Sequence, residues 1–140
     1  MNLSDKITVV TGAASGIGKA TAKAFAEVGG MVYMGDLNEE NGEKVAEELR
    51  AAGGKATFIR LDITDDASIA GFKDQIIGES GRLDVLANVA GWGHTEFFAQ
   101  SAPADWDKEI DINLKGPMKM CHAFVPGMFE QNYGRIVNVS

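Results

Sequence analysis

The stretch Thr11-Gly12-Ala13-Ala14-Ser15-Gly16-Ile17-Gly18 constrains the fold of this chain more than any other. It follows an apolar run at residues 7–10 that predicts a short buried strand, and it leads into residues 19–28, which predict a helix. Strand, glycine turn and helix form the context in which glycines bind a phosphate. The first glycine permits a turn that a Cβ would obstruct, and the later ones let the backbone approach a pyrophosphate at the positive end of the helix.

Strand-period and helix-period segments alternate along all 140 residues, and no change of composition marks a linker. Asn38 and Thr64 are expected to cap two helices, which Gly53 and Gly81 are expected to end. Parallel strands joined by right-handed crossovers predict a single α/β domain, a doubly wound Rossmann-type sheet of five strands in the order 3-2-1-4-5. The expected strands are residues 7–10, 31–36, 56–61, 83–89 and 134–139, and the expected helices are residues 19–28, 38–52, 64–79, 102–113 and 115–130.

The charge and composition of the chain exclude several classes of function. A net charge of −7 without a cluster of Lys or Arg argues against nucleic acid and against an anionic membrane surface as partners. The single Cys121 excludes an internal disulfide framework and fits a reducing compartment, so a cytoplasmic location is expected. His94 and His122 do not have the spacing of metal ligands, and no metal site is expected.

Asp36 ends the second expected strand, 18 residues after Gly18. A carboxylate at this position accepts hydrogen bonds from the adenosine ribose of a dinucleotide. It would repel the 2′-phosphate of NADP by roughly 4 kcal/mol at about 4 Å and an effective dielectric near 20, almost a thousandfold in affinity. Neither Leu37 nor Ser15 supplies a compensating cation, so NAD is the expected cofactor. The alternative is a solvated turn aspartate or a helix cap.

Three further polar positions lie where the expected strands and helices end. Asp62 follows the third strand and could meet an adenine amino group, with Ile63 against the ring, although aspartates at such positions often cap helices. The string Asn88-Val89-Ala90-Gly91 ends the fourth strand with small residues that leave room for a ligand, or it makes an ordinary Asx turn. Asn113 lies late in an expected helix, where asparagine is a poor helix former, and spacing alone leaves its role open.

Together these motifs resemble the short-chain dehydrogenase/reductase family over the whole chain. Residues 11–18 resemble the family's TGxxxGIG, Asp62-Ile63 its adenine-contacting pair, and Asn88-Val89-Ala90-Gly91 its NNAG, with Val89 in place of the second asparagine. Asn113 matches the asparagine of the catalytic tetrad, whose backbone carbonyl would hold a water of the proton relay. Asn138-Val139-Ser140 resembles the stretch that leads to the catalytic serine.

The resemblance also implies residues that this sequence does not contain. The family's serine would follow Ser140 by one position, and no Tyr-xxx-Lys pair occurs, because Leu37 and Val137 stand four residues after Tyr33 and Tyr133. The chain is therefore expected to be the cofactor-binding part of a longer enzyme and to be inactive alone. A non-catalytic NAD-binding or regulatory module and a methyltransferase-like domain that binds an adenosyl ligand stay open as alternatives.

The expected activity of the complete enzyme is NAD-dependent interconversion of a secondary alcohol and a ketone. Trp92 and the aromatic residues that follow it lie on the ligand side and would line an apolar substrate pocket. The Gly91-Trp92 stretch particularly resembles family members that act on hydroxyacyl-CoA esters. The helix at residues 115–130 is apolar nearly all round, so it needs a partner beyond its own sheet. In the resembling family this helix forms a subunit interface, which implies a homodimer or homotetramer.

Overall fold

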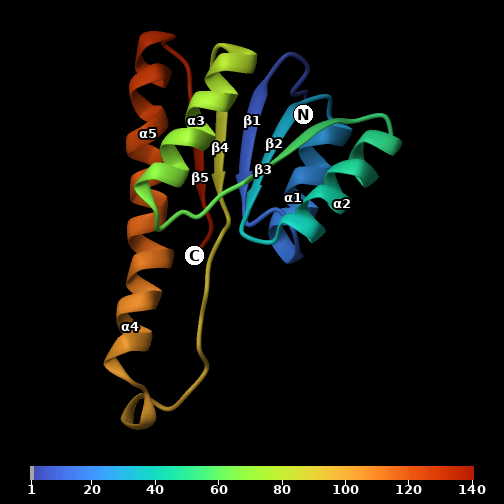
Figure 1. The fold of residues 1–140 in the computed structure, drawn as a ribbon. Helices are drawn as coiled ribbons and strands as arrows, with labels where there is room; N and C mark the ends of the chain where they lie inside the picture. The colour runs from blue at the N-terminus through green and yellow to red at the C-terminus, as the bar shows by residue number, and fades with distance from the viewer. Residues whose placement is uncertain (1) are drawn as a thin grey trace.

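The computed structural model describes residues 2–140, which form a parallel five-stranded sheet with helices on both faces (Figure 1). The strand order is β3-β2-β1-β4-β5, as the sequence predicts. The central strand β1 pairs with β2 on one side and with β4 on the other, which creates the switch point at which such sheets bind ligands. The strands are β1 (Ile7–Thr11), β2 (Met31–Asp36), β3 (Lys55–Arg60), β4 (Val85–Asn88) and β5 (Arg135–Asn138).

Each face of the sheet has its own hydrophobic core. Val9 and Val10 are adjacent in β1 and both fully buried, because successive side chains point to opposite faces and helices cover both. Val10 packs in the core beneath α1 (Gly16–Glu27) and α2 (Glu39–Ala51). Val9 packs in the core beneath α3 (Asp66–Ser80) and α5 (Gly116–Glu130). The fold is therefore doubly wound.

Helix ends follow the expected chemistry at most positions. The side chain of Asn38 accepts a hydrogen bond from the Asn41 amide and caps α2, and Gly81 ends α3 in the left-handed region at φ 73°. The expectation that Thr64 caps α3 is wrong. Asp65 is the cap and accepts from the Ala67 amide, while the hydroxyl of Thr64 donates to Asp62 instead.

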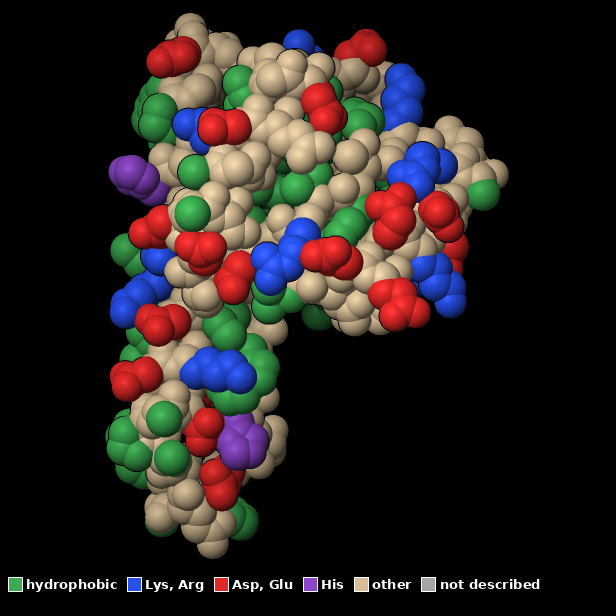
Figure 2. All heavy atoms as spheres, in the orientation of Figure 1, with side chains coloured by type: hydrophobic (Ala, Val, Ile, Leu, Met, Phe, Trp, Pro, Cys, Tyr) green, Lys and Arg blue, Asp and Glu red, His purple; other side chains and the backbone are tan. Residues whose placement is uncertain are grey.

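The two helices expected at residues 102–113 and 115–130 are joined without a break. Helix α4 (Pro103–Ile110) continues through a π-helical segment, Asp111–Lys115, directly into α5. Figure 1 shows this column standing beside the sheet, with its α4 end reaching well beyond the strands. No residue of α4 is buried, and Figure 2 shows hydrophobic side chains exposed on this projecting part.

The column formed by the π-helical segment and α5 buries one apolar face and leaves another exposed. Met120, Phe124 and Met128 lie in the core, whereas Leu114 and Met118 remain 57% and 61% exposed. Pro126 lies inside α5, which continues past it to Glu130. Among the described residues, no helix combines the length and the apolar character that crossing a bilayer requires.

Candidate functional site

A cavity of about 940 Å³ lies at the carboxyl ends of β1, β2, β3 and β4. It brings together almost all of the binding residues predicted from the sequence, and two exposed apolar side chains, Ile17 and Leu37, stand at its wall. Asn88 and Asn113 are not in its lining. The predicted binding residues that line it are Gly12, Ser15, Gly16, Ile17, Gly18, Asp36, Leu37, Asp62, Ile63, Ala90 and Gly91.

Each glycine of the turn after β1 is suited to its position for a different structural reason. Gly12 has φ 67°, and a Cβ there would lie 2.8 Å from the Cα of Ala90 on the neighbouring strand end. A Cβ at Gly18 would overlap the carbonyl of Gly12, so this glycine lets α1 pack against β1. Gly16, at φ 51°, lines the cavity, and a Cβ there would meet nothing within 4 Å. The turn therefore presents bare backbone to an open space at the N-terminus of α1, as a pyrophosphate group requires.

Asp36 connects the end of β2 to the glycine turn. Its Oδ2 accepts a hydrogen bond of 3.0 Å from the Ala14 amide, and its Oδ1 accepts one of 3.0 Å from the Asn38 amide. A carboxylate has about four acceptor positions, so both oxygens keep capacity for donors from a ligand in the cavity. The predicted ribose-binding carboxylate thus also holds the glycine turn in place.

A basic residue occupies the position opposite Asp36 on the neighbouring strand. Arg60 is the register partner of Asp36 in the β2–β3 pairing, and its Nε lies 3.2 Å from Oε1 of Glu39. The expectation of no compensating cation rests on Leu37 and Ser15 alone, and the strand pairing adds Arg60 as a basic residue. Sequence spacing could not reveal this cation, because Arg60 and Asp36 are neighbours only across paired strands.

The loop after β3 places Asp62 at the cavity, and hydrogen bonds within the loop hold its carboxylate in one orientation. Its Oδ1 accepts hydrogen bonds from the amide and the hydroxyl of Thr64, at 2.9 and 2.6 Å. These two bonds hold the pKa of the Asp62 carboxyl below its usual value, and the bond from the hydroxyl has the larger effect. The nearby charges of Arg60 and Lys119 lower the pKa by less. Asp62 is therefore ionised at neutral pH, with acceptor capacity for a donor such as an adenine amino group.

Thr11 joins the two strands at the switch point and was not among the residues predicted for the site. Its hydroxyl accepts hydrogen bonds of 3.0 Å from the amides of both Val89 and Ala90. Its side chain is 1% exposed, so these bonds form away from water. A hydroxyl residue at the end of a strand, directly before the glycine turn, is the sequence signal that could have identified it.

Asn88 is buried rather than exposed in the cavity. Its amide nitrogen donates to Oδ1 of Asn138 at 2.8 Å, which ties β4 to β5, and lies 3.6 Å from Sγ of Cys121. Its own Oδ1 has no hydrogen-bond partner among the described residues. The structure thus gives Asn88 a strand-bridging contact, and Cys121 is half-buried in α5.

Asn113 lies in the π-helical segment and holds the loop after β4. Its Oδ1 accepts from the amide of Trp92 at 2.9 Å, and its Nδ2 donates to the Trp92 carbonyl at 2.6 Å. A Cβ at Gly91 would lie 3.2 Å from this Oδ1, so a small residue suits that position. π-helical turns inside α-helices often occur at functional sites.

Only part of the aromatic loop meets the cavity. Trp92 is half-buried in the cavity lining, with Nζ of Lys108 located 3.9 Å from its ring centroid. Phe97 and Phe98 lie outside the lining and are 80% and 78% exposed, and Phe98 stacks on Trp106. The expectation of a pocket lined by the whole loop therefore holds for Trp92 but not for these two phenylalanines.

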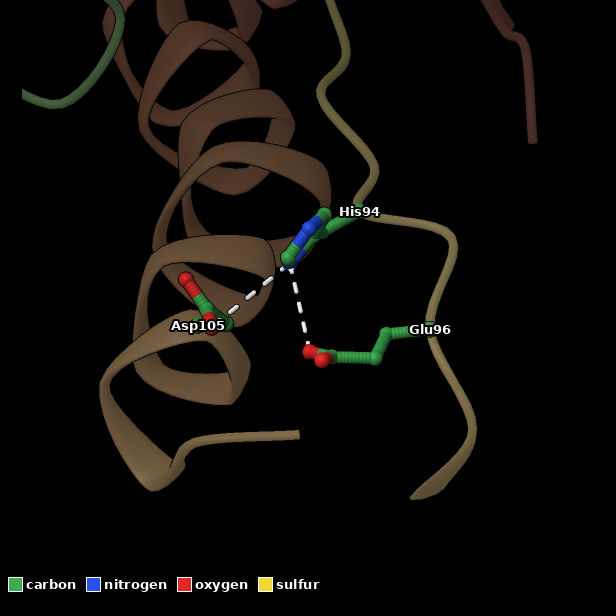
Figure 3. A group of neighbouring side chains, drawn as sticks. All are labelled: His94, Glu96 and Asp105. Carbon is green, nitrogen blue, oxygen red and sulfur yellow. Dashed lines mark ion pairs between the residues drawn. The ribbon is translucent and has the colours of Figure 1, made fainter. Parts of the chain in front are cut away.

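Within residues 2–140, His94 is the one histidine whose ring lies beside carboxylates. Nδ1 of His94 lies 3.6 Å from Oδ2 of Asp105 and 3.8 Å from Oε2 of Glu96, and Figure 3 shows the three side chains turned toward one another. A metal ion could be held by such a group, since the three ligand atoms lie within 4.8 Å of one another. Exposed ion pairs have the same appearance, and the absence of a metal site stays a prediction.

Comparison with known proteins gives concordant matches over nearly the whole chain. A family model described as short chain dehydrogenase matches residues 6–140. The 3-oxoacyl-[acyl-carrier-protein] reductase FabG of Thermotoga maritima is 39% identical over 140 residues. BbsD of Thauera aromatica, a (2S)-[(R)-hydroxy(phenyl)methyl]succinyl-CoA dehydrogenase subunit, is 36% identical over 140 residues.

A solved structure shares the architecture closely. The crystal structure of a metagenomic short-chain oxidoreductase in complex with NADP matches with a TM-score of 0.93 and 37% sequence identity. The match covers 99% of this chain and 63% of that one. FabG and BbsD are covered over 57% and 56% of their lengths, so the chain spans little more than half of these relatives.

Proposed function

Because the chain belongs to the short-chain dehydrogenase family, we propose that its cavity binds NAD for the interconversion of a secondary alcohol and a ketone. One observation carries the proposal: the bare backbone at Gly16 and the Asp36 carboxylate border the same cavity of about 940 Å³. The turn at residues 12–18 would hold the pyrophosphate, Asp36 the adenosine ribose, and Asp62 with Ile63 the adenine. When bound, the nicotinamide ring supplies the hydride acceptor.

The proposed preference for NAD over NADP depends on Asp36. A 2′-phosphate beside this carboxylate would meet a like charge, and the nearby Arg60 is already paired with Glu39 at 3.2 Å. An exposed ion pair is weak, however, so Arg60 is the residue that could lower the preference. The solved relative in complex with NADP shows that the phosphorylated cofactor occurs in this family.

Competitive binding of NAD and NADP to the complete protein tests this preference. Asp36→Ala is expected to narrow the difference between the two dissociation constants by about tenfold or more, because it removes the repulsion. Glu40→Ala is the matched control, since it removes one exposed carboxylate from the same region, at the first turn of α2. Equal affinities for the two cofactors in the unmutated protein would contradict the proposal.

We infer that Asn113 supports catalysis through position rather than through its own proton chemistry. Its side chain is occupied with both backbone groups of Trp92, so the loop after β4 is held against the π-helical segment. In the complete protein, the backbone carbonyl of Asn113 would hold a water of the proton relay. No Tyr-xxx-Lys pair occurs within the 140 residues, so this chain alone is proposed to be inactive.

The proposed substrate class is a hydroxyacyl thioester. By their names, FabG acts on an oxoacyl thioester and BbsD acts on a hydroxylated acyl-CoA. Trp92 offers a planar apolar surface at the cavity, beside the cation of Lys108. NADH formation with a panel of secondary alcohols and hydroxyacyl-CoA esters tests the class, and turnover of simple alcohols alone would contradict it.

A non-catalytic NAD-binding module is the second candidate. The two candidates differ in one measurement, because a binding module would bind NAD and yet form no NADH with any alcohol in the panel.

A further inference from the structure

The loop of residues 62–64 forms the cavity wall between β3 and α3, where the proposed function places the adenine. Hydrogen bonds within the loop join Oδ1 of Asp62 to the amide and the hydroxyl of Thr64. Such bonds fix the shape of the loop but not its place, because both partners move together. The position of the loop must therefore come from contacts with other elements.

Helix α5 supplies two such contacts from one helical turn. Nζ of Lys119 donates a hydrogen bond of 2.8 Å to the backbone carbonyl of Thr64, and it lies 2.8 Å from Oδ1 of Asp66. Three residues earlier, Gly116 has no side chain, and a Cβ there would lie 2.6 Å from Cδ1 of Ile63. Residues three apart lie on the same face of a helix, so both contacts reach the loop from one side.

The carbonyl contact of Lys119 matters more than its ion pair. The side chain of Asp66 is 84% exposed, and ion pairs at such positions contribute little. The Lys119 side chain is only 34% exposed, and its bond to Thr64 is a charge-assisted hydrogen bond to backbone. Removing the ammonium would leave the Thr64 carbonyl without this donor and remove one of the two contacts between the loop and α5.

We propose that Lys119 is a positioning residue for the adenine half of the dinucleotide, acting through the backbone of Thr64. This inference rests on the proposed function, since it assigns a role within the same cavity. It also connects two parts of the site, because the column that carries Lys119 also carries Asn113, which holds the loop after β4. One helical column thus sets the position of both cavity walls.

Titration of the complete protein with two cofactor fragments tests the role of Lys119. ADP-ribose contains the adenine and nicotinamide mononucleotide does not. In Lys119→Met the dissociation constant of ADP-ribose is expected to rise about tenfold, the scale of one charged hydrogen bond, while that of nicotinamide mononucleotide stays unchanged. Lys119→Arg is expected to restore most of the affinity, since it keeps a cationic donor.

Two further variants serve as controls. Lys115→Met removes a cation one turn earlier that pairs with Asp111 and not with the loop, and it is expected to bind ADP-ribose as the unmutated protein does. Asp66→Asn removes the ion pair but keeps the bond to Thr64, and it is also expected to be unchanged. An equal loss in Asp66→Asn would transfer the effect to α3 and overturn the role of the carbonyl contact.

The failure of this inference differs from the failure of the proposed function. Hydrogen exchange of the amides of residues 62–65 needs no ligand, and Lys119→Met is expected to exchange faster there than Lys115→Met. Unchanged exchange, or an equal loss of affinity for both fragments, would overturn the positioning role. An unmutated protein that binds neither ADP-ribose nor NAD would instead overturn the proposed function.

Discussion

Gly16 and Gly18 stand two residues apart and are glycine for opposite reasons. A Cβ at Gly18 would overlap the carbonyl of Gly12, so Gly18→Ala is expected to lower the free energy of unfolding by about 3 kcal/mol, as overpacking does. A Cβ at Gly16 would meet nothing, so Gly16→Ala is expected to cost only about 1 kcal/mol for its left-handed backbone. Urea denaturation of both variants measures this difference.

For ligand binding the order of the two variants is expected to reverse, so that Gly16→Ala has the larger effect. Gly16 lines the cavity, so the added methyl group of a folded Gly16→Ala protein is expected to weaken NAD binding at least about tenfold. Calorimetric titration with NAD measures this loss. A Gly16→Ala protein that binds NAD normally would show that the pyrophosphate does not lie over this turn.

Asp62 is expected to make the free energy of unfolding depend on pH. Hydrogen bonds from Thr64 lower its pKa below the ordinary value of 3.8, so its ionised form stabilises the fold above that pH. This stability is lost as the pH falls through the lowered folded pKa. The unfolding free energy of the unmutated protein is therefore expected to exceed that of Asp62→Asn by a margin that is constant near neutral pH and shrinks once the pH falls below about 4. A margin independent of pH would contradict the assignment.

At the scale of elements, the alternation of apolar runs with helical segments was enough to place the strands, and the rule of right-handed crossovers predicted their order. The run at residues 7–10 and the aspartate at 36 identified β1 and β2, because buried parallel strands are continuous apolar runs. The continuous junction of α4 and α5 was not predictable, since Asn113 and Gly116 are both poor helix formers and the two expected helices were separated at Leu114. Contacts from outside the helix, with Trp92 and Ile63, accompany its continuation through both residues.

The exposed apolar face of the column that joins the π-helical segment to α5 leads to a prediction about assembly. Leu114 and Met118 are 57% and 61% exposed and lie on one side of the column. If this face is a subunit interface, Leu114→Glu with Met118→Glu is expected to shift the complete protein from a homodimer or homotetramer to a monomer, because buried unpaired carboxylates are costly. Sedimentation velocity at micromolar concentration measures the shift.

A matched control separates an interface effect from a charge effect. Ala20 is exposed on α1, on the opposite face of the sheet, and Ala20→Glu adds the same kind of charge there. It is expected to leave the assembly intact. A complete protein that is already monomeric without any substitution would defeat the prediction.

At the scale of the whole molecule, the sequence predicted which residues lie around the cavity. It did not predict the individual hydrogen bonds and ion pairs that these and neighbouring residues form. The glycine turn, Asp36 and Asp62 lie around one cavity because parallel strands end at the same edge of the sheet. The role of Thr11 across two strands and the pairing of Arg60 with Glu39 were not predictable. The first depends on the pairing of β1 with β4 and the second on the pairing of β2 with β3, which places Arg60 opposite Asp36, near the start of α2.

The central claim is that this cavity holds a nicotinamide dinucleotide rather than another adenosine ligand. Calorimetric titration of the complete protein with NAD and with S-adenosylmethionine tests it directly, because the glycine turn alone suits both. The account predicts saturable binding of NAD, weakened in Gly16→Ala, and no measurable binding of S-adenosylmethionine. Saturable binding of S-adenosylmethionine without binding of NAD would contradict it.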